Sequence, residues 1–284
     1  MSGLFAKLFQ PCIAPCTGGR RTATHTEMNL DNQNICNLDS NEGYQAILRS
    51  QDVIRVVSLK NNRIKKIPQS LFRKKFPKLE ILNISDNELS EVPENIKYLD
   101  ALKELDLQKN ELEKLPDEIG LCKSLEKLLL GANPLADLPN DIVKLSNLVV
   151  LQLNGVNLLE LPFELGNMKS LKQLECRENL LKEIPESLSN LASLEFLDFG
   201  ENDIECLPED FSKLLCLREI WLDKNEITHL PESIGKLPNL ESLDFSINNI
   251  EQLPEDMSGL TNLTDLSWAC QVRPKFASEE LIGE

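Results

Sequence analysis

The sequence is poor in the residues on which most catalytic and metal sites depend. It has only two histidines, His25 and His229, so the close pair Cys12 and Cys16 lacks the second ligand pair of a zinc site. The 12 glycines are scattered, and none forms a loop that could cradle a phosphate. The motifs G-x-S-x-G, H-E-x-x-H and C-x-x-C are also missing. We therefore expect no enzyme, and neither catalytic residues nor a metal or other cofactor.

Long apolar runs and excess positive charge are missing as well. No run approaches the roughly 18 apolar residues of a membrane-spanning helix, and Lys7 and Gln10 interrupt the apolar residues at the start of the chain, so no secretory signal is expected. The formal net charge of -16 disfavours nucleic acid as a partner. It favours partners with basic segments; the alternative is that the acidic residues only solvate a long, thin surface.

Eight cysteines are spread through the chain without a disulfide-like arrangement. Cys122 and Cys176 fall at apolar positions of the pattern described below, so both are predicted to be packed free thiols. They lie two repeats apart, about 10 Å at the usual strand spacing, which is too far for a disulfide. This use of cysteine indicates a reducing, intracellular environment.

What the chain has in abundance is one repeated pattern, LxxLxLxxNxLxxLP, of which residues 102–116 are the clearest copy. The asparagine position recurs every 23 residues after a first interval of 25, and Val156 takes its place in the fifth repeat. This period is that of a leucine-rich repeat. Side chains at this position are predicted to bond backbone groups where the chain leaves each strand. They are structural rather than catalytic: Asn62, Asn87, Asn110, Asn133, Asn179, Asn202, Asn225 and Asn248.

The alternation within each repeat predicts a strand, with Leu105 and Leu107 on one face and polar residues on the other. The fold class is α/β: a leucine-rich repeat solenoid, shaped as a curved horseshoe with a parallel concave β-sheet and an irregular or short-helical convex side. No single repeat buries its leucines alone, so neighbouring repeats stabilise one another. The expected strands are centred near residues 57, 82, 105, 128, 151, 174, 197, 220 and 243.

The unbroken period indicates one elongated repeat domain with short segments at each end. The expected boundaries are an N-terminal tail at 1–24, a capping unit at 25–49 without the asparagine, a repeat domain at 50–268 and a divergent tail at 269–284. The repeat domain holds about nine full repeats and a partial tenth.

The outward strand positions predict a partner-binding surface on the concave face. Phe196 and Trp221 are aromatic residues on adjacent strands within an acidic wall. Two interpretations stand: the two rings stack and shield the sheet, or they anchor a partner with apolar and basic side chains. The carboxylates are expected to be solvated, with nothing to raise a pKa. The predicted binding residues are Glu104, Asp106, Glu175, Arg177, Phe196, Asp198, Glu219, Trp221, Asp223 and Asp244.

The N-terminal tail has features of a membrane-touching segment. Residues 4–9 carry four apolar side chains at helical spacing, and Cys12 and Cys16 and then Arg20 and Arg21 follow. Cysteines beside an interfacial segment are candidates for S-palmitoylation, and two acyl chains hold a protein far better than one. The alternative is a disordered tail with two inert cysteines.

Position-specific features of the chain resemble the N-terminal leucine-rich repeat region of the LAP family, leucine-rich repeat and PDZ proteins of the Scribble, Erbin, Densin and Lano type. These features are the cysteine pair before a degenerate first unit, LNGVNLLELP without its asparagine, LECRENLLKEIP, LREIWLDKN and LPEDMSGLTNLTDL. The likeness covers residues 4–268. Members of that family carry more repeats, mostly followed by PDZ domains, so PDZ-type peptide binding is not carried over; a short isoform, a fragment and a mispredicted product all remain open.

The resemblance implies a cytoplasmic scaffold of cell polarity and signalling, peripheral at the plasma membrane and placed at basolateral membranes or cell junctions. It also matches Cys12 and Cys16 to lipidated N-terminal cysteines. The alternative function is a regulatory subunit of a small-GTPase (Ras-type) or phosphatase pathway, because similar repeats occur there. Under both hypotheses the partners are proteins.

Overall fold

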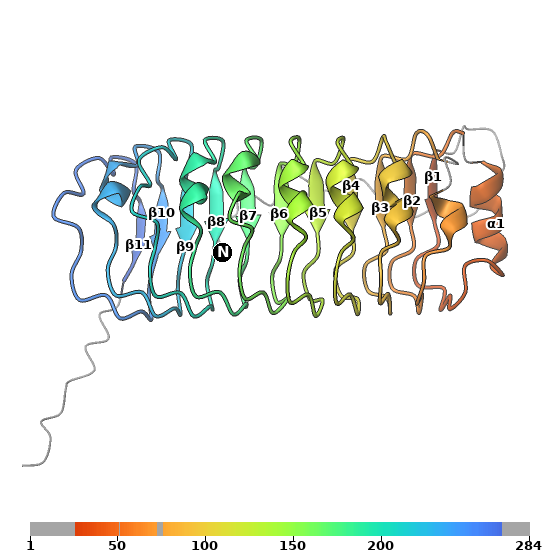
Figure 1. The fold of residues 1–284 in the computed structure, drawn as a ribbon, viewed down its shortest axis with the longest axis horizontal. Helices are drawn as coiled ribbons and strands as arrows, with labels where there is room; N and C mark the ends of the chain where they lie inside the picture. The colour runs from red at the N-terminus through yellow and green to blue at the C-terminus, as the bar shows by residue number, and fades with distance from the viewer. Residues whose placement is uncertain (1–25, 51, 73–75, 269–284) are drawn as a thin grey trace, which may run out of the picture.

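Successive repeats lie side by side in a single elongated stack (Figure 1). The computed structural model describes residues 26–50, 52–72 and 76–268. Each repeat contributes one short strand, and the strands follow chain order in an 11-stranded sheet in which every neighbouring pair is parallel. The predicted leucine-rich repeat solenoid is confirmed, and each expected strand centre falls within a strand.

The strands are three residues each, and the sheet adds one strand at either end of the predicted set. Their bounds are β1 (Glu27–Asn29), β2 (Val56–Ser58), β3 (Ile81–Asn83), β4 (Glu104–Asp106), β5 (Lys127–Leu129), β6 (Val150–Gln152), β7 (Gln173–Glu175), β8 (Phe196–Asp198), β9 (Glu219–Trp221), β10 (Ser242–Asp244) and β11 (Asp265–Ser267).

The side of the stack opposite the sheet carries short 3-10 helices, and one α-helix, α1 (Glu42–Arg49), lies at the first end (Figure 1). In five repeats a helix of five residues begins directly after the proline of the pattern, whose fixed φ suits the entry to a helical turn. The 3-10 helices are η2 (Gln69–Leu71), η3 (Glu94–Tyr98), η4 (Asp117–Leu121), η5 (Asn140–Lys144), η6 (Leu165–Asn167), η7 (Glu186–Asn190) and η8 (Glu232–Lys236).

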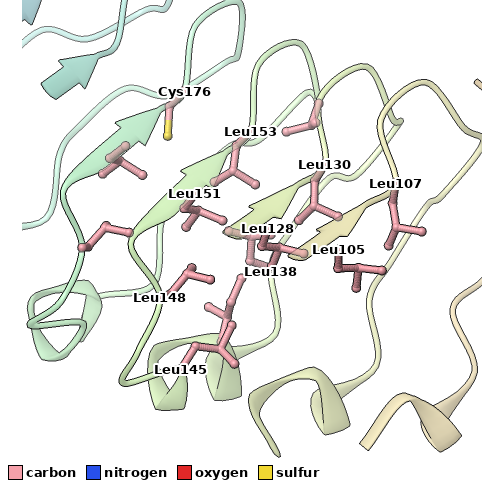
Figure 2. Close-up of a cluster of buried hydrophobic side chains, with 14 of the residues drawn as sticks. Leu105, Leu107, Leu128, Leu130, Leu138, Leu145, Leu148, Leu151, Leu153 and Cys176 are labelled. Atoms are coloured by element: carbon pink, nitrogen blue, oxygen red, sulfur yellow. The ribbon is translucent and has the colours of Figure 1, made fainter. Parts of the chain in front are cut away.

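A continuous leucine-rich core runs along the inside of the stack (Figure 2). The middle residue of each strand from β2 to β10 points into it; Leu128, Leu151 and Leu174, for example, are fully buried. Each such side chain contributes roughly 1.5–3 kcal/mol through burial. Cys122 and Cys176 are buried there as free thiols, as the sequence predicts, and burial raises the pKa of the Cys122 thiol to about 12.

The first end of the stack is closed by β1 and α1 rather than by a degraded repeat alone. Asn41 caps α1 by accepting a hydrogen bond from the Tyr44 N–H at 2.9 Å. Tyr44 and Ile47 are fully buried against the first repeat. At the other end, Leu266 and Trp268 remain exposed.

The eight asparagines of the pattern line up along the inside of the stack, and we call this row the asparagine ladder. Asn110 shows the arrangement: its Nδ2 donates to the carbonyls of Ile84 and Leu107 at 3.0 Å, and its Oδ1 accepts from Leu89 N at 3.0 Å. One side chain thus bonds backbone groups of two neighbouring repeats. Since the region is buried, no solvent is available to satisfy these groups instead.

In the fifth repeat, fully buried Val156 interrupts the ladder, and neighbouring groups take over the missing bonds. Asn179 Oδ1 accepts from the N–H of Val156 and of Leu158 at 3.2 and 3.0 Å. The Leu135 N–H, which an asparagine at position 156 would bind, donates to the Asn133 carbonyl at 2.9 Å instead. The interruption therefore leaves this amide satisfied.

Candidate functional site

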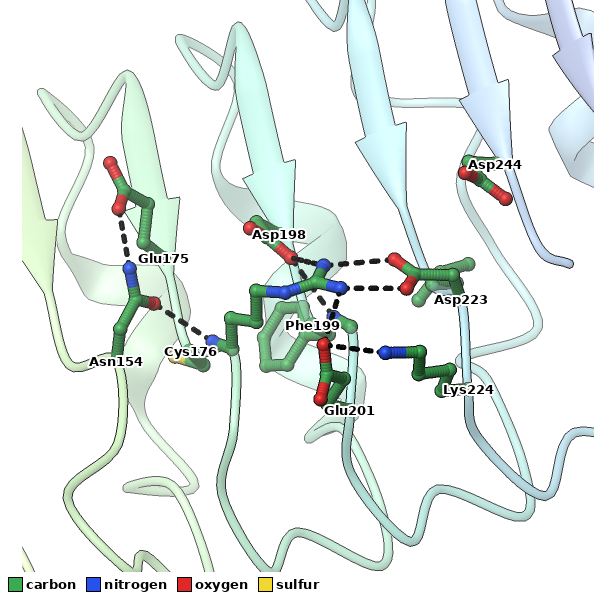
Figure 3. A network of polar contacts seen from close by, with 12 residues as sticks. Asn154, Glu175, Cys176, Asp198, Phe199, Glu201, Asp223, Lys224 and Asp244 are labelled. Carbon is green, nitrogen blue, oxygen red and sulfur yellow. Dashed lines mark hydrogen bonds and ion pairs between the residues drawn. The ribbon is translucent and has the colours of Figure 1, made fainter. Parts of the chain in front are cut away.

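The first and third residues of each strand form the outward columns of the concave face, in which some side chains are exposed and others are covered by their neighbours. Around strands β7 to β10, Arg177, which follows β7, lies near Trp221, Asp223 and Asp244 and contacts Asp198. Figure 3 shows Asp198, Asp223 and Asp244 on this face. Glu104 and Asp106 lie on β4, three strands from β7 and so about 14 Å away at the usual spacing.

The centre of this region is an ion-pair network around Arg177 (Figure 3). The guanidinium donates two hydrogen bonds to Asp223, at 2.9 and 2.7 Å, although Asp223 lies two repeats further along the chain. It also donates to Glu201 at 2.9 Å and to Asp198 at 3.4 Å. Glu201 accepts in turn from Lys224 at 3.0 Å. One cation therefore joins three repeats through a bidentate contact.

Gly200 is the residue that allows Arg177 to reach across. A Cβ atom at position 200 would lie 2.1 Å from Arg177 Nη1 and 2.6 Å from Asp223 Oδ1. The guanidinium and its partner thus occupy the space that any other side chain would need. A side chain at position 200 would therefore displace this contact, so the glycine serves the close approach rather than an unusual backbone angle.

The concave carboxylates differ from the sequence prediction, which expected nothing to raise their pKa. Burial raises the pKa of Asp198 to about 6, against the lowering effects of the Gly200 N–H and of Arg177. Burial likewise raises the pKa of Asp106 and Glu219. The physical reason is that the neighbouring strands cover these short columns: Asp198 is only 4% exposed. Asp198 is held by the Gly200 N–H at 2.9 Å, so its role is structural.

The predicted aromatic pair, Phe196 and Trp221, is less exposed than a free binding anchor would be. Phe196 is buried, and its ring meets the Trp221 ring edge to face, with centroids 5.3 Å apart. Trp221 is half-buried and keeps part of its surface on the concave face. The stacking interpretation therefore describes Phe196, whereas Trp221 remains able to contact a partner.

Several other predicted residues are engaged within the sheet. Glu175 accepts from Asn154 Nδ2 at 2.7 Å, and Glu104 forms an ion pair with Lys127 at 3.0 Å. Asp106 accepts from Asn83 Nδ2 at 3.0 Å. Glu219 is buried beneath the concave surface. Glu175, Glu104 and Asp106 are thus engaged by neighbouring repeats before any partner is considered.

A hollow of about 310 Å³ opens on the concave face next to Trp221. Its lining includes Arg177 and Asp223 on one side and Asp244 and Asp265 on the other. The Asp244 carboxylate accepts a hydrogen bond at 2.9 Å from the Ser246 N–H of its own repeat. Within residues 26–50, 52–72 and 76–268, neither Asp244 nor Asp265 has an ion-pair partner. The hollow thus combines part of an indole with two uncompensated carboxylates.

Three lining residues were missed at the sequence level: Ser242, Asp265 and Ser267. The available signal was their column, because they occupy the same outward strand positions as Glu219 and Trp221, one and two repeats on. Asp265 lies in the partial tenth repeat. The pattern is incomplete there, so its outward positions are harder to assign from the sequence.

Some predicted features lie outside the described residues, namely Cys12, Cys16 and the tails at 1–24 and 269–284. In the part of the chain that the structure does describe, no helix has both the length and the apolar character needed to cross a membrane. In that same part, no group of three or more potential ligands is arranged to hold a metal ion.

Comparison with known proteins agrees with the repeat architecture. The family model described as "Leucine rich repeat" matches residues 53–112 and 216–267. No curated protein sequence matches the chain significantly. The fold is that of a leucine-rich repeat solenoid, and the matched residues carry the sequence pattern of that repeat.

Solved structures with the same architecture come from bacteria and plants. A leucine-rich repeat protein of Leptospira interrogans is 30% identical, with a TM-score of 0.65 over 79% of this chain and 62% of its own. The plant peptide hormone receptor RGFR1, solved in complex with RGF2, is 29% identical, with a TM-score of 0.65 over 76% of this chain and 40% of its own. The ectodomain of the receptor kinase GASSHO1/SCHENGEN3 of Arabidopsis thaliana was solved in complex with CASPARIAN STRIP INTEGRITY FACTOR 2. It is 28% identical, with a TM-score of 0.62 over 78% of this chain and 30% of its own. The chain thus spans less than two thirds of the length of each.

Proposed function

We propose that this protein is a binding module whose concave face, over β9 to β11, takes an extended protein segment with one apolar and at least one basic side chain. The observation that carries the proposal is the hollow beside Trp221, which Asp244 and Asp265 also line, neither of them with an ion-pair partner among the described residues. An aromatic surface beside uncompensated acids suits a partner that supplies both the apolar contact and the charge.

The turn after β10 supports the same surface. Ile247 has a φ of 57° and a side chain that is 46% exposed. A β-branched residue is disfavoured in this left-handed region, where glycine or asparagine is the usual choice. The Ile247 carbonyl accepts a hydrogen bond from the Asn225 N–H at 3.3 Å, whereas its side chain is exposed, three residues after Asp244. We infer that the Ile247 side chain supplies a further apolar contact for the same partner.

The first prediction concerns Trp221. Trp221→Ala is expected to weaken binding of the partner segment at least tenfold, or about 1.4 kcal/mol, because the indole supplies the apolar wall of the hollow. Asp244→Lys is expected to weaken it similarly and mainly through slower association. The measurement is the dissociation constant of peptides recovered from a random displayed library on the unmodified protein. Peptides that bind the Trp221→Ala and Asp244→Lys variants as tightly as the parent would refute this role.

Asp198 is not a suitable steering residue for that experiment. Although its position in the sequence suggests an exposed charge, a lysine there would be buried beside Arg177 and would destabilise the protein. Leu215→Ala provides a matched control, because Leu215 is an exposed apolar residue outside the concave columns. It is expected to leave the same dissociation constants unchanged.

The finer proposal is a LAP-type scaffold of cell polarity and junctions, peripheral at the cytoplasmic side of the basolateral membrane. The resemblance over residues 4–268 supports it. The competing hypothesis is a regulatory subunit of a Ras-type or phosphatase pathway. Affinity capture from polarised epithelial cells, repeated with Trp221→Ala, separates the two: junctional proteins lost with the variant favour the scaffold, and a phosphatase or Ras-type complex favours the alternative.

Membrane attachment is proposed through Cys12 and Cys16. The double change Cys12→Ser with Cys16→Ser is expected to move the protein from the membrane fraction to the cytosol, because two acyl chains supply the stable anchoring that one does not. Fractionation after labelling with a palmitate analogue measures this, and hydroxylamine should release the label from the parent. An unchanged distribution would identify the cysteines as inert.

A further inference from the structure

A second surface, on the opposite side of the fifth repeat from the sheet, has no role in the function proposed above. Its centre is Phe163, whose side chain is 74% exposed. In the repeats on either side, the residue after the proline is Asn140 or Glu186, and a 3-10 helix begins with it. In the fifth repeat the helix η6 begins only at Leu165, so Phe163 stands on a turn.

Phe163 forms part of a groove of about 550 Å³ that crosses the fourth, fifth and sixth repeats. Its apolar floor includes Leu138, Leu161 and Pro162, all of which are buried. An exposed phenylalanine over such a floor gains little from folding, because most of its surface stays in water. Binding an apolar side chain of a partner would bury it.

The charges around the groove select the kind of partner. Asp137, Glu160 and Glu183 occupy one position in three successive repeats, and Glu186 adds a fourth carboxylate. The equivalent residue of the next repeat is Cys206. Glu183 and Cys206 form a parallel β-bridge, so these two neighbours in the column lie close together. Like charges directly opposite each other on neighbouring segments of the chain repel one another. None of these four carboxylates has an ion-pair partner among the described residues, so their negative charge is not neutralised within the described fold.

Elsewhere on the stack, charged columns are arranged the opposite way. Along the column that precedes the strands, Glu80 pairs with both Arg55 and Lys103, Lys172 pairs with Glu195, and Arg218 pairs with Glu241. Acid and base alternate there, as folding alone favours. The acidic row in the groove does not alternate in this way, and it lies beside an exposed phenylalanine.

We propose that the Phe163 groove is a docking site for an extended protein segment in which one apolar side chain is flanked by lysine or arginine. The span of three repeats is about 10 Å at strand spacing, which three to four extended residues cover. A second copy of this chain fits poorly, because it would bring its own acidic row, and a net charge of -16, against the first.

The test is a selection of displayed random heptapeptides on the whole protein, with counter-selection on Phe163→Ser. Peptides that survive are expected to carry an apolar residue between basic residues. Synthetic copies are expected to bind at least tenfold more weakly to Phe163→Ser and to the double variant Glu160→Gln with Glu183→Gln. The matched controls, Leu215→Ser and Glu205→Gln with Glu251→Gln, change exposed residues outside the groove and are expected to bind normally.

The Trp221→Ala variant separates this proposal from the concave-face function, because peptides of the Phe163 groove are expected to bind it normally. The proposal is overturned if no peptide survives counter-selection, if surviving peptides lack basic residues, or if the controls lose binding equally. It is also overturned if Phe163→Ser converts a dimeric parent into a monomer in sedimentation, since the groove would then be covered by a second copy.

Discussion

Replacing Arg177 by glutamine is expected to lower the free energy of unfolding by about 3 kcal/mol at pH 8, because it removes one partner of a largely buried ion-pair network. Asp223 would lose a bidentate partner, and Asp198, which is only 4% exposed, would keep its charge without a nearby cation. Glutamine retains the length of the side chain and a hydrogen-bond donor, so the change tests the charge rather than the packing.

The loss is expected to depend on pH in a defined direction. The native pKa of Asp198, about 6, exceeds its ordinary value of 3.8, so the folded protein binds this proton more tightly than the unfolded chain. The contribution of Asp198 to stability therefore falls as pH rises from about 4 through about 6. Removing Arg177 raises this pKa further, so the variant should fall more steeply with pH and should differ less from the parent at pH 5 than at pH 8.

Urea denaturation of the parent and the variant at pH 5 and pH 8 measures both effects. Arg218→Gln is the matched control, since Arg218 pairs with Glu241 on an exposed part of the sheet. Its expected change is within about 0.5 kcal/mol at either pH. A loss no larger than that of Arg218→Gln would show that the Arg177 network does not stabilise the fold. A loss independent of pH would contradict the part assigned to Asp198.

Replacing Asn110 by alanine is expected to lower the free energy of unfolding by about 2 kcal/mol. The Leu89 N–H would lose its hydrogen bond to Asn110 Oδ1 in a buried place, and an unsatisfied buried donor costs about 1–3 kcal/mol. The carbonyls of Ile84 and Leu107 would suffer less, because Asn87 and Asn133 also donate to them. The expected loss is therefore that of one orphaned amide and not of four hydrogen bonds.

Val156→Asn provides the comparison within the same row. The Leu135 N–H is already satisfied by the Asn133 carbonyl, so an asparagine at position 156 replaces an existing bond and exchanges buried apolar surface for a polar group. Its effect is expected to be smaller than that of Asn110→Ala. Chemical denaturation of both variants measures this, and a neutral Asn110→Ala would contradict the structural role of the asparagine ladder.

The regular part of the fold was predictable because one short pattern repeats. The leucines at strand positions, the asparagine at the strand exit and the proline before each helical turn all depend on neighbours within one repeat or the next. The first cap was not predictable in the same way. The pattern of residues 25–49 suggested a degraded repeat, whereas α1 forms because Asn41 caps it and Tyr44 and Ile47 pack on the first repeat.

The concave face was predictable in its columns but not in its contacts. The reach of Arg177 to Asp223 joins residues 46 apart in sequence and depends on the missing Cβ of Gly200 between them. The burial of Phe196 and Asp198 depends on how closely neighbouring strands pack, which a single repeat does not reveal. Phe163 was visible at the sequence level as the one aromatic residue directly after a pattern proline, although the groove around it was not.

The most direct test of the central claim is the crystal structure of the protein with a peptide whose binding depends on Trp221. We expect a basic nitrogen of the peptide within about 4 Å of Asp244 or Asp265, and an apolar side chain against the Trp221 ring. A peptide bound away from β9 to β11, or one that contacts this hollow without any basic residue, would contradict the claim.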